Sequence, residues 1–129
     1  MLHAVNSERV ARGLSKLCMN KKLQHAAQLH ARDMATKGFL SHTGSNNSTV
    51  SGRVKAAAYR WTYVAENVAA GQTTVADVVA SWMNSKEHRA NILSPDARMF
   101  ECGYAYSPRS KHKHYWTQNF ASGRGETCN

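Results

Sequence analysis

The sequence predicts an α+β domain in which helices pack on a small antiparallel sheet. Apolar residues recur at helical spacing in most of the chain up to Leu93, whereas the segment after Pro95 alternates apolar and polar positions as strands do. The chain has 129 residues, the usual size of one domain. No linker or internal repeat divides it, so we expect a single domain over residues 1–129.

Two long segments in the first half of the chain carry helical signals. Residues 2–13 end at a glycine, which suits a helix stop, and residues 21–38 follow Asn20, a residue type that caps helix N-termini. A polar loop is expected over residues 41–52, and a short helical turn over residues 54–58.

The clearest helical pattern starts after Thr73 or Thr74. Its apolar stripe is wide and consists of Val75, Val78, Val79, Trp82 and Met83. Residues 85–93 are expected to form a short helix or turn that ends before Pro95.

Strand spacing begins near the C-terminus. Residues 99–106 and 115–120 both alternate, and the basic run at residues 109–114 separates them. We interpret the two runs as a β-hairpin with a long, solvated loop. The large side chains expected to be buried are Trp82, Phe100, Tyr104, Trp116 and Phe120.

The composition is that of a folded, basic protein. Lys and Arg number 17 against 8 Asp and Glu, a formal net charge of +9, and 42% of residues are hydrophobic. The positive charge favours an anionic partner such as an acidic glycan or a lipid surface, although a basic surface also simply keeps a protein in solution. No motif indicates a specific nucleic-acid partner, and no apolar run is long enough to span a membrane. Residues 1–5 lead directly into helix-like sequence, so we expect any signal peptide to have been removed.

A few residues are open to covalent modification. The cysteines are Cys18, Cys102 and Cys128, and this odd count permits at most one disulfide. Two overlapping N-glycosylation sequons begin at Asn46 and Asn47.

The usual short motifs of catalysis are missing from the sequence. It has no His-Glu-x-x-His motif, no Gly-x-Ser-x-Gly turn and no phosphate-binding loop. The remaining candidates for chemistry are His42, Glu66, His88 and His114, which fall in loops or near helix ends. His30 lies beside an apolar helix face and is interpreted as a structural histidine.

Four short motifs occur in one order along the chain. They are Ser-His-Thr-Gly at residues 41–44, Ala-Glu-Asn-Val-Ala at 65–69, the run at 82–93, and Tyr-Trp-Thr-Gln-Asn-Phe at 115–120. With these motifs the sequence resembles the CAP superfamily of cysteine-rich secretory proteins, antigen 5 proteins and plant pathogenesis-related proteins. The resemblance covers residues 2–120, and the motif at residues 88–93 is more similar to those of the short members from bacteria, fungi and oomycetes than to those of the disulfide-rich animal and plant members. It implies a three-layer α-β-α sandwich around an antiparallel sheet.

The resemblance also implies an open central cleft that holds two histidines and two glutamates. By position, His42 corresponds to the first histidine and Glu66 to the first glutamate. Ser85 stands where the second glutamate usually lies, with His88 three residues further on, and Tyr115 stands where the last histidine usually lies. We therefore expect His42, Glu66 and His88 to converge. Ser85 and Tyr115 are expected as their polar neighbours.

The expected cleft has two interpretations. Two imidazoles and a carboxylate are ligand types that Zn²⁺ accepts, so His42 and His88 could hold a zinc ion. In the other interpretation, Glu66 orients a histidine within a structural, hydrogen-bonded cluster. His114 precedes Tyr115, and consecutive strand residues face opposite ways, so we expect His114 to point away from the cleft.

The resemblance favours a secreted, non-enzymatic binding module that acts as a monomer. Its expected partner is a sterol or other small hydrophobic ligand, a divalent metal ion, or an extracellular target on a host or microbe. One alternative is a hydrolase that uses a metal or the His and Glu side chains. The other is a binder of anionic polymers that acts through the basic surface.

The fold implied by the resemblance also suggests a disulfide pairing. The last strand of that fold must end near the first two helices. Cys18 lies between these helices and Cys128 follows the last strand, so we expect a Cys18–Cys128 bond and, with it, secretion into an oxidising compartment. Cys102 alternates with Phe100 and Tyr104 and is expected to remain a buried thiol.

Overall fold

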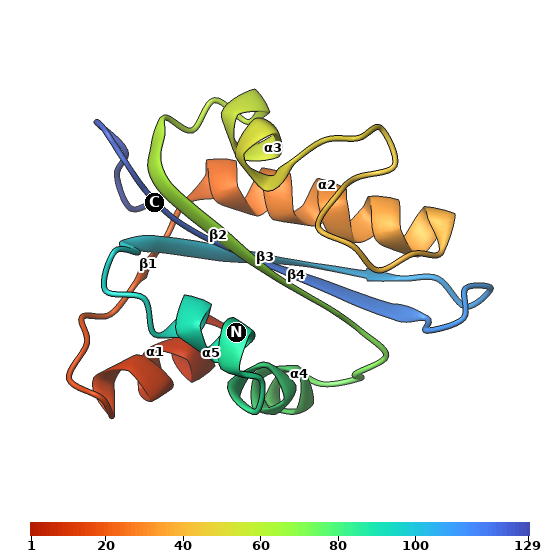
Figure 1. The fold of residues 1–129 in the computed structure, drawn as a ribbon, viewed down its shortest axis with the longest axis horizontal. Coiled ribbons are helices and arrows are strands. Elements are labelled where there is room, and N and C mark those ends of the chain that lie inside the picture. The colour runs from red at the N-terminus through yellow and green to blue at the C-terminus, as the bar shows by residue number, and fades with distance from the viewer.

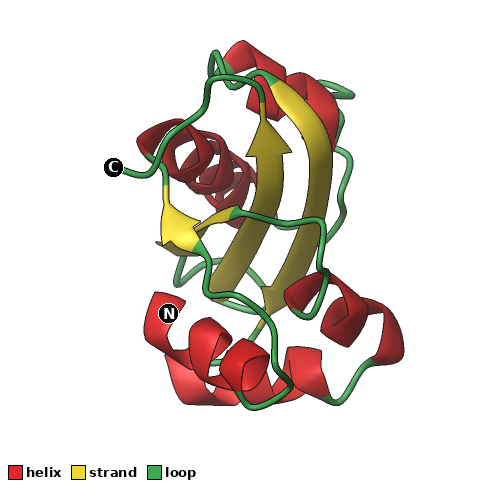
Figure 2. Ribbon diagram, turned by 90° about the vertical axis from the view of Figure 1, so that its left-hand side faces the viewer, coloured by secondary structure: helices red, strands yellow, loops and turns green.

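A sheet separates two layers of helices in the computed structural model, which describes all residues 1–129 (Figure 1). The elements are α1 (Leu2–Val10), β1 (Cys18–Met19), α2 (Lys21–Lys37), α3 (Val50–Ala56), β2 (Trp61–Ala70), α4 (Val75–Met83), α5 (Lys86–Ile92), β3 (Met99–Tyr106) and β4 (His114–Gly123). Helices α2 and α3 cover one face of the sheet, and α1, α4 and α5 cover the other, as Figure 2 shows from a second direction. The predicted α-β-α sandwich is therefore confirmed.

The four strands are ordered β1-β3-β4-β2. Strands β3 and β4 form the predicted hairpin, with Tyr106 opposite His114 next to the loop, and β2 pairs antiparallel with β4. The expectation of a wholly antiparallel sheet is wrong in one detail, because β1 pairs parallel with the start of β3. Strand β1 has two residues, too few to produce an alternating pattern in the sequence.

Capping residues fix three of the helix boundaries. The Asn20 side chain accepts hydrogen bonds from the main-chain nitrogens of Lys22 and Leu23, at 2.9 and 3.3 Å, so α2 begins where the sequence indicated. Thr74 caps α4 in the same way through the nitrogen of Asp77, at 3.1 Å. Helix α3 begins earlier than the predicted turn at residues 54–58, because Thr49 caps it.

The core on the α1, α4 and α5 side of the sheet contains four of the five large side chains that were expected to be buried. The exposed fractions are 1% for Trp82, 1% for Phe100, 6% for Trp116 and 0% for Phe120. The expectation for Tyr104 is wrong, because this residue is 37% exposed. Its ring packs at an angle of 52° against that of Trp116, with 4.5 Å between the ring centroids.

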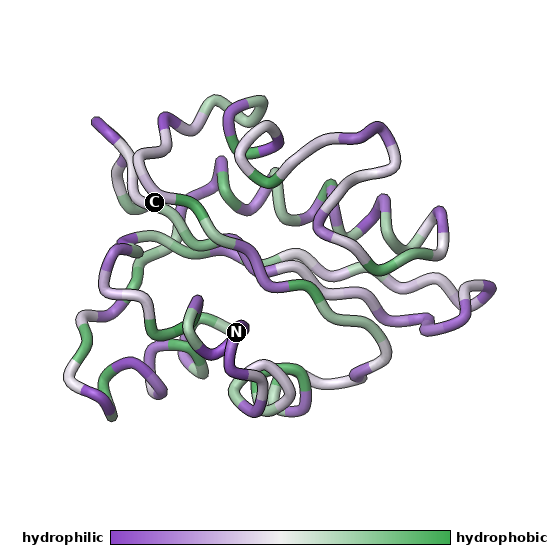
Figure 3. Tube along the Cα trace, in the orientation of Figure 1, coloured by the Kyte–Doolittle hydropathy of each residue, from purple (hydrophilic) through white to green (hydrophobic).

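At Gly103, the main chain of β3 lies against α2 without room for a side chain between them. A Cβ atom added at Gly103 would stand 2.5 Å from the main chain of Ala27, well inside contact distance. The glycine therefore permits the close packing of helix on strand. At the far end of the same hairpin, hydrophilic residues gather at the tip (Figure 3).

The predicted Cys18–Cys128 disulfide is confirmed, with 5.5 Å between its Cα atoms. It holds the chain after β4 against β1, where the Asn129 main-chain nitrogen also donates to the Met19 carbonyl at 2.8 Å. Cys102 is the free cysteine and is only partly buried. Burial raises the pKa of its thiol to about 11, which keeps it protonated and unreactive at neutral pH.

Candidate functional site

Glu66 lies at the centre of the candidate site, on the edge strand β2. Its side chain is 1% exposed and points toward α2 and α3. The ring nitrogen Nδ1 of His42 donates to Oε1 at 3.0 Å, and Nη2 of Arg53 donates to Oε2 at 2.8 Å. The Asn119 amide, in the orientation that satisfies both of its polar atoms, places its nitrogen 3.1 Å from Oε2. Both carboxylate oxygens are therefore occupied.

Arg53 is the main counter-ion of Glu66, and the sequence analysis did not identify it. Its side chain is only 10% exposed and comes from α3. Besides the ion pair with Glu66, its Nη1 atom donates to the main-chain oxygen of Ser48 at 3.0 Å. Arg53 therefore ties the loop before α3 to the sheet. A buried arginine cannot be distinguished by sequence from the other basic residues of this chain, because burial depends on residues distant in sequence.

The two predicted histidines lie near each other but make different contacts. His42 is 56% exposed at its side chain, so its second ring nitrogen is open to solvent. His88 lies on α5 and is partly buried. Its pKa is lowered mainly by burial and also by the electrostatic effect of the nearby His42. No hydrogen bond or ion pair joins the His88 ring to Glu66 or His42. The structure thus brings His42 and Glu66 together and leaves His88 as a neighbour.

Amide side chains from three of the sequence motifs hold α5 against β2. Asn91 donates from Nδ2 to Oδ1 of Asn67 at 2.8 Å and to the main-chain oxygen of Glu66 at 3.1 Å. Asn67 donates in turn to the Gln118 side chain and to the main-chain oxygen of His88, each at 3.1 Å. Asn67 and Gln118 are fully buried, so these bonds form away from water. The network fixes the helix that carries His88.

The two expected polar neighbours lie in different surroundings. Ser85 precedes α5 and is partly buried, and its side chain makes no capping hydrogen bond. Tyr115 is fully buried in an apolar cluster with Met34, Ala35 and Val68, and its hydroxyl has no partner. On β4 it stands four residues from Asn119, which pairs with Glu66, so Tyr115 does not line the site.

His114 has a different partner. The Tyr104 hydroxyl lies 2.7 Å from its Nδ1 atom, on the face of the hairpin that carries Trp116. This face is opposite to the one on which Tyr115 packs, as the alternation of strand side chains requires.

The residues around Glu66 do not fit a zinc site. A catalytic zinc centre takes three protein ligands, and a ligating carboxylate needs a free oxygen. Each oxygen of Glu66 already has a partner. Of the nearby imidazoles, His30 lies 4.0 Å from Oε1, but the same ring nitrogen is engaged by the Ser41 carbonyl at 2.7 Å, which leaves His42 and His88. No group of three or more His, Cys, Asp or Glu side chains in the chain is arranged to hold a metal ion.

A three-layer α-β-α sandwich with a buried glutamate paired to a histidine on its edge strand defines the class of the protein. The sequence profile of the cysteine-rich secretory protein family, CAP, matches residues 2–120, and the chain belongs to this family.

Two proteins of Bacillus subtilis (strain 168) are similar in sequence. The uncharacterised protein YkwD is 32% identical over 120 residues, which are 93% of this chain and 45% of YkwD. The uncharacterised membrane protein YlbC is 27% identical over 120 residues, which are 93% of this chain and 33% of YlbC. The chain therefore spans less than half the length of each of these relatives.

Solved structures share the fold. An extracellular protein of Bacillus anthracis (strain Ames) that contains an SCP domain is 26% identical, with a TM-score of 0.80 over 91% of this chain and 37% of that one. An outer surface protein of Borrelia burgdorferi is 17% identical, with a TM-score of 0.86 over 95% of this chain and 90% of that one. None of the helices in our chain is both long and apolar enough to cross a membrane.

Proposed function

We propose that the protein is a secreted, non-catalytic binding module that contacts an extracellular target through the surface around His42 and His88. One observation carries this proposal: both oxygens of Glu66 are engaged, by His42 and by Arg53. The glutamate therefore serves to position the His42 ring, whose outer nitrogen is left open for a partner.

The same arrangement argues against a hydrolase in which Glu66 is the general base. A general base needs an oxygen or nitrogen within reach of the substrate proton, and the carboxylate of Glu66 is 1% exposed behind its partners. A serine or cysteine nucleophile needs a base beside it, and no hydroxyl or thiol of these residue types is hydrogen-bonded to an imidazole in the chain.

The chemistry of the site favours a polar target. Around Glu66 stand three histidines, an arginine and the amides that hold α5, so a sterol or fatty acid would find few apolar contacts there. Secretion is supported by the Cys18–Cys128 disulfide, which persists in oxidising compartments. The Bacillus anthracis relative is itself described as extracellular.

A test of this function needs a binding readout and a catalytic readout. We expect the wild-type protein to bind members of a glycan and lipid array, and the double variant His42→Ala/His88→Ala to lose that binding. His3→Ala is the matched control, because His3 is an exposed histidine of α1, an element that carries none of the residues around Glu66. Turnover of ester or peptide substrates that disappears in Glu66→Gln would instead establish the hydrolase.

A second function, binding to anionic polymers, is supported by the tip of the β3–β4 hairpin. Arg109, Lys111, His112 and Lys113 are all exposed there, and no acidic residue stands between β3 and β4 (Figure 3). Binding to heparin should then weaken steeply as the salt concentration rises from about 50 to about 300 mM. The salt dependence should be smaller in the variant Lys111→Ser/Lys113→Asn. Asparagine suits residue 113 because the φ angle there is 66°. An unchanged salt dependence in this variant would locate the binding elsewhere.

A further inference from the structure

The end of the β3–β4 hairpin extends beyond α4 and is left uncovered on the side of the sheet against which α4 packs (Figure 1). Four rings lie on this face in two cross-strand pairs, Tyr104 opposite Trp116 and Tyr106 opposite His114. The ring centroids are 4.5 Å apart in the first pair and 5.0 Å apart in the second. Trp116 is buried, but Tyr104 is 37% and Tyr106 55% exposed. We call these four residues the aromatic face of the hairpin.

The rings of the aromatic face are held in place by hydrogen bonds. The Tyr104 hydroxyl lies 2.7 Å from Nδ1 of His114, and Nε1 of Trp116 donates to the carbonyl of Gln72 at 2.8 Å. The side-chain amide of Gln28, in α2, also bonds to the main-chain nitrogen and oxygen of Tyr104, at 3.1 and 2.7 Å. Rings that are already ordered lose little conformational entropy when a ligand stacks on them.

The loop next to the aromatic face carries free positive charge. Arg109, Lys111 and Lys113 are exposed there, and none of the three forms an ion pair within the chain. The hairpin therefore combines exposed, ordered rings with unpaired cations.

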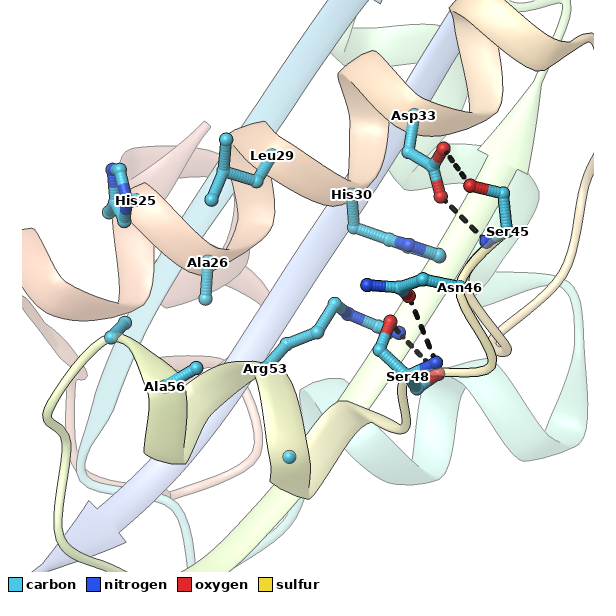
Figure 4. A pocket seen from close by; sticks show the side chains of 12 residues that line it. His25, Ala26, Leu29, His30, Asp33, Ser45, Asn46, Ser48, Arg53 and Ala56 are labelled. Carbon is cyan, nitrogen blue, oxygen red and sulfur yellow. Dashed lines mark hydrogen bonds between the residues drawn. The ribbon is translucent and has the colours of Figure 1, made fainter.

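The pocket of about 330 Å³ between α2 and α3 lacks this combination (Figure 4). Its charged side chains already have partners. The Asp33 carboxylate accepts from the main-chain nitrogen and the hydroxyl of Ser45, at 2.8 and 2.6 Å, and Arg53 pairs with Glu66 at 2.8 Å. No Phe, Tyr or Trp side chain lines the pocket. The hairpin is therefore the stronger candidate for a second binding surface.

The two features of the hairpin suit a ligand that has both exposed rings and negative charge. Aromatic side chains stack on nucleic-acid bases, and Lys and Arg side chains follow the phosphates. A lipid bilayer fits poorly, because residues 107–113 offer no large apolar side chain that could insert into it.

The arrangement of rings and cations favours a nucleic acid over an acidic polysaccharide. In the polysaccharide, the negative groups are attached to the same sugar rings that would stack. In a single-stranded nucleic acid, the flat bases and the charged backbone are separate parts of each nucleotide. On the hairpin, too, the rings lie on the strands and the cations lie in the loop.

We propose that the end of the β3–β4 hairpin binds single-stranded nucleic acid without sequence preference. The proposal rests on the second function above, binding to anionic polymers, and names the polymer. The bases stack on Tyr104 and Tyr106, and the phosphates contact Arg109, Lys111 and Lys113. The two tyrosines are two residues apart on one strand, about 7 Å, so neighbouring bases of an extended chain each meet one ring. A duplex keeps its bases stacked inside and cannot make these contacts.

Fluorescence anisotropy with four labelled ligands tests the proposal. They are an oligothymidylate of about 12 nucleotides, an abasic deoxyribose phosphate oligomer of the same length, heparin and polygalacturonate. The abasic oligomer keeps the phosphates and lacks the bases. We expect oligothymidylate to bind at least about fivefold more tightly than the abasic oligomer, the lower limit of what one stacked base contributes. Equal binding of the two overturns the proposal, and heparin binding then decides by itself whether the second function stands.

Variants separate stacking from charge. Tyr106→Ala should weaken binding of oligothymidylate at least about fivefold and leave binding of heparin unchanged, which also shows that the variant is folded. Trp61→Ala is the matched control, because Trp61 is 42% exposed at the start of β2, opposite the end of β4 that is far from the loop, and it should bind as wild type does. Lys111→Ser/Lys113→Asn should weaken binding of oligothymidylate and heparin alike. If Tyr106→Ala binds oligothymidylate normally, or loses polygalacturonate as strongly as oligothymidylate, the assignment to a nucleic acid is wrong.

Discussion

The ion pair between Arg53 and Glu66 is expected to carry a large share of the stability of the site. Replacement of Arg53 by methionine keeps the aliphatic stem of the side chain and removes the charge. It leaves the carboxylate of Glu66, 1% exposed, without the partner that lies 2.8 Å away. It also removes the hydrogen bond from Nη1 to the Ser48 main chain.

The size of the effect follows from burial. Breaking a buried ion pair from one side costs about 3–5 kcal/mol, because a buried charge is left uncompensated. His42 and Asn119 still contact the carboxylate, so we expect Arg53→Met to lower the free energy of unfolding by roughly 3 kcal/mol. The double variant Arg53→Met/Glu66→Gln removes both charges and should recover about 2 kcal/mol of this loss.

Urea denaturation at pH 7.5, followed by tryptophan fluorescence, measures these differences. The exposed pair between Arg12 and Glu8 is the matched control, because its side chains are 45% and 37% exposed. Its removal should change stability by less than about 0.5 kcal/mol. A coupling energy between Arg53 and Glu66 as small as that of the control pair would refute the reasoning.

Three further outcomes are expected. Trp82→Ala should cost about 3–5 kcal/mol, whereas Tyr104→Ala, at a 37% exposed position, should cost much less in the same denaturation assay. Cys128→Ser should lower the free energy of unfolding by up to about 4–5 kcal/mol, since the lost bond closes a loop with a sequence separation of 110, and reduced wild type should match the variant. Burial lowers the pKa of His30 below its unfolded value of about 6.5, so the unfolded chain binds protons more readily and stability should fall as the pH drops from 7.5 toward 5.5. His30→Gln should reduce this fall, leaving the contribution of His88, whose pKa burial also lowers; an unchanged pH dependence would contradict the assignment.

Elements whose limits depend on the properties of single residues or on a short apolar pattern were predicted well from the sequence. Asn20 and Gly38 bound α2 because an N-cap side chain and a left-handed φ of 71° are properties of single residues. Helix α4 and the hairpin followed from their apolar periodicity. Strand β2 had no such signal, since Glu66 and Asn67 are both buried and the strand does not alternate.

The candidate site was only partly accessible from sequence. Motif resemblance singled out His42 and Glu66, which are in contact, but it also selected Tyr115, which is buried among apolar residues. Arg53 carries no local signal, and the apolar helix face beside His30 indicated only a structural role, because the contacts of both residues arise when α2 and α3 pack over β2. Contacts between distant segments decide which basic residue becomes a counter-ion.

The position of the disulfide gives the domain an unequal response to mechanical force. Because Cys18 and Cys128 are joined, tension applied at residues 1 and 129 bypasses every element from α2 to β4. Only α1 lies outside the closed loop. It is held to the rest of the fold by Val5, which packs in the core, and by Arg9, whose Nη1 atom donates to the carbonyls of Ile92 and Ser94 at 2.9 and 2.8 Å. Under such tension the oxidised segment between residues 1 and 129 therefore lengthens by little more than residues 1–17 allow, about 60 Å at full extension, and the sheet that supports Glu66 stays intact.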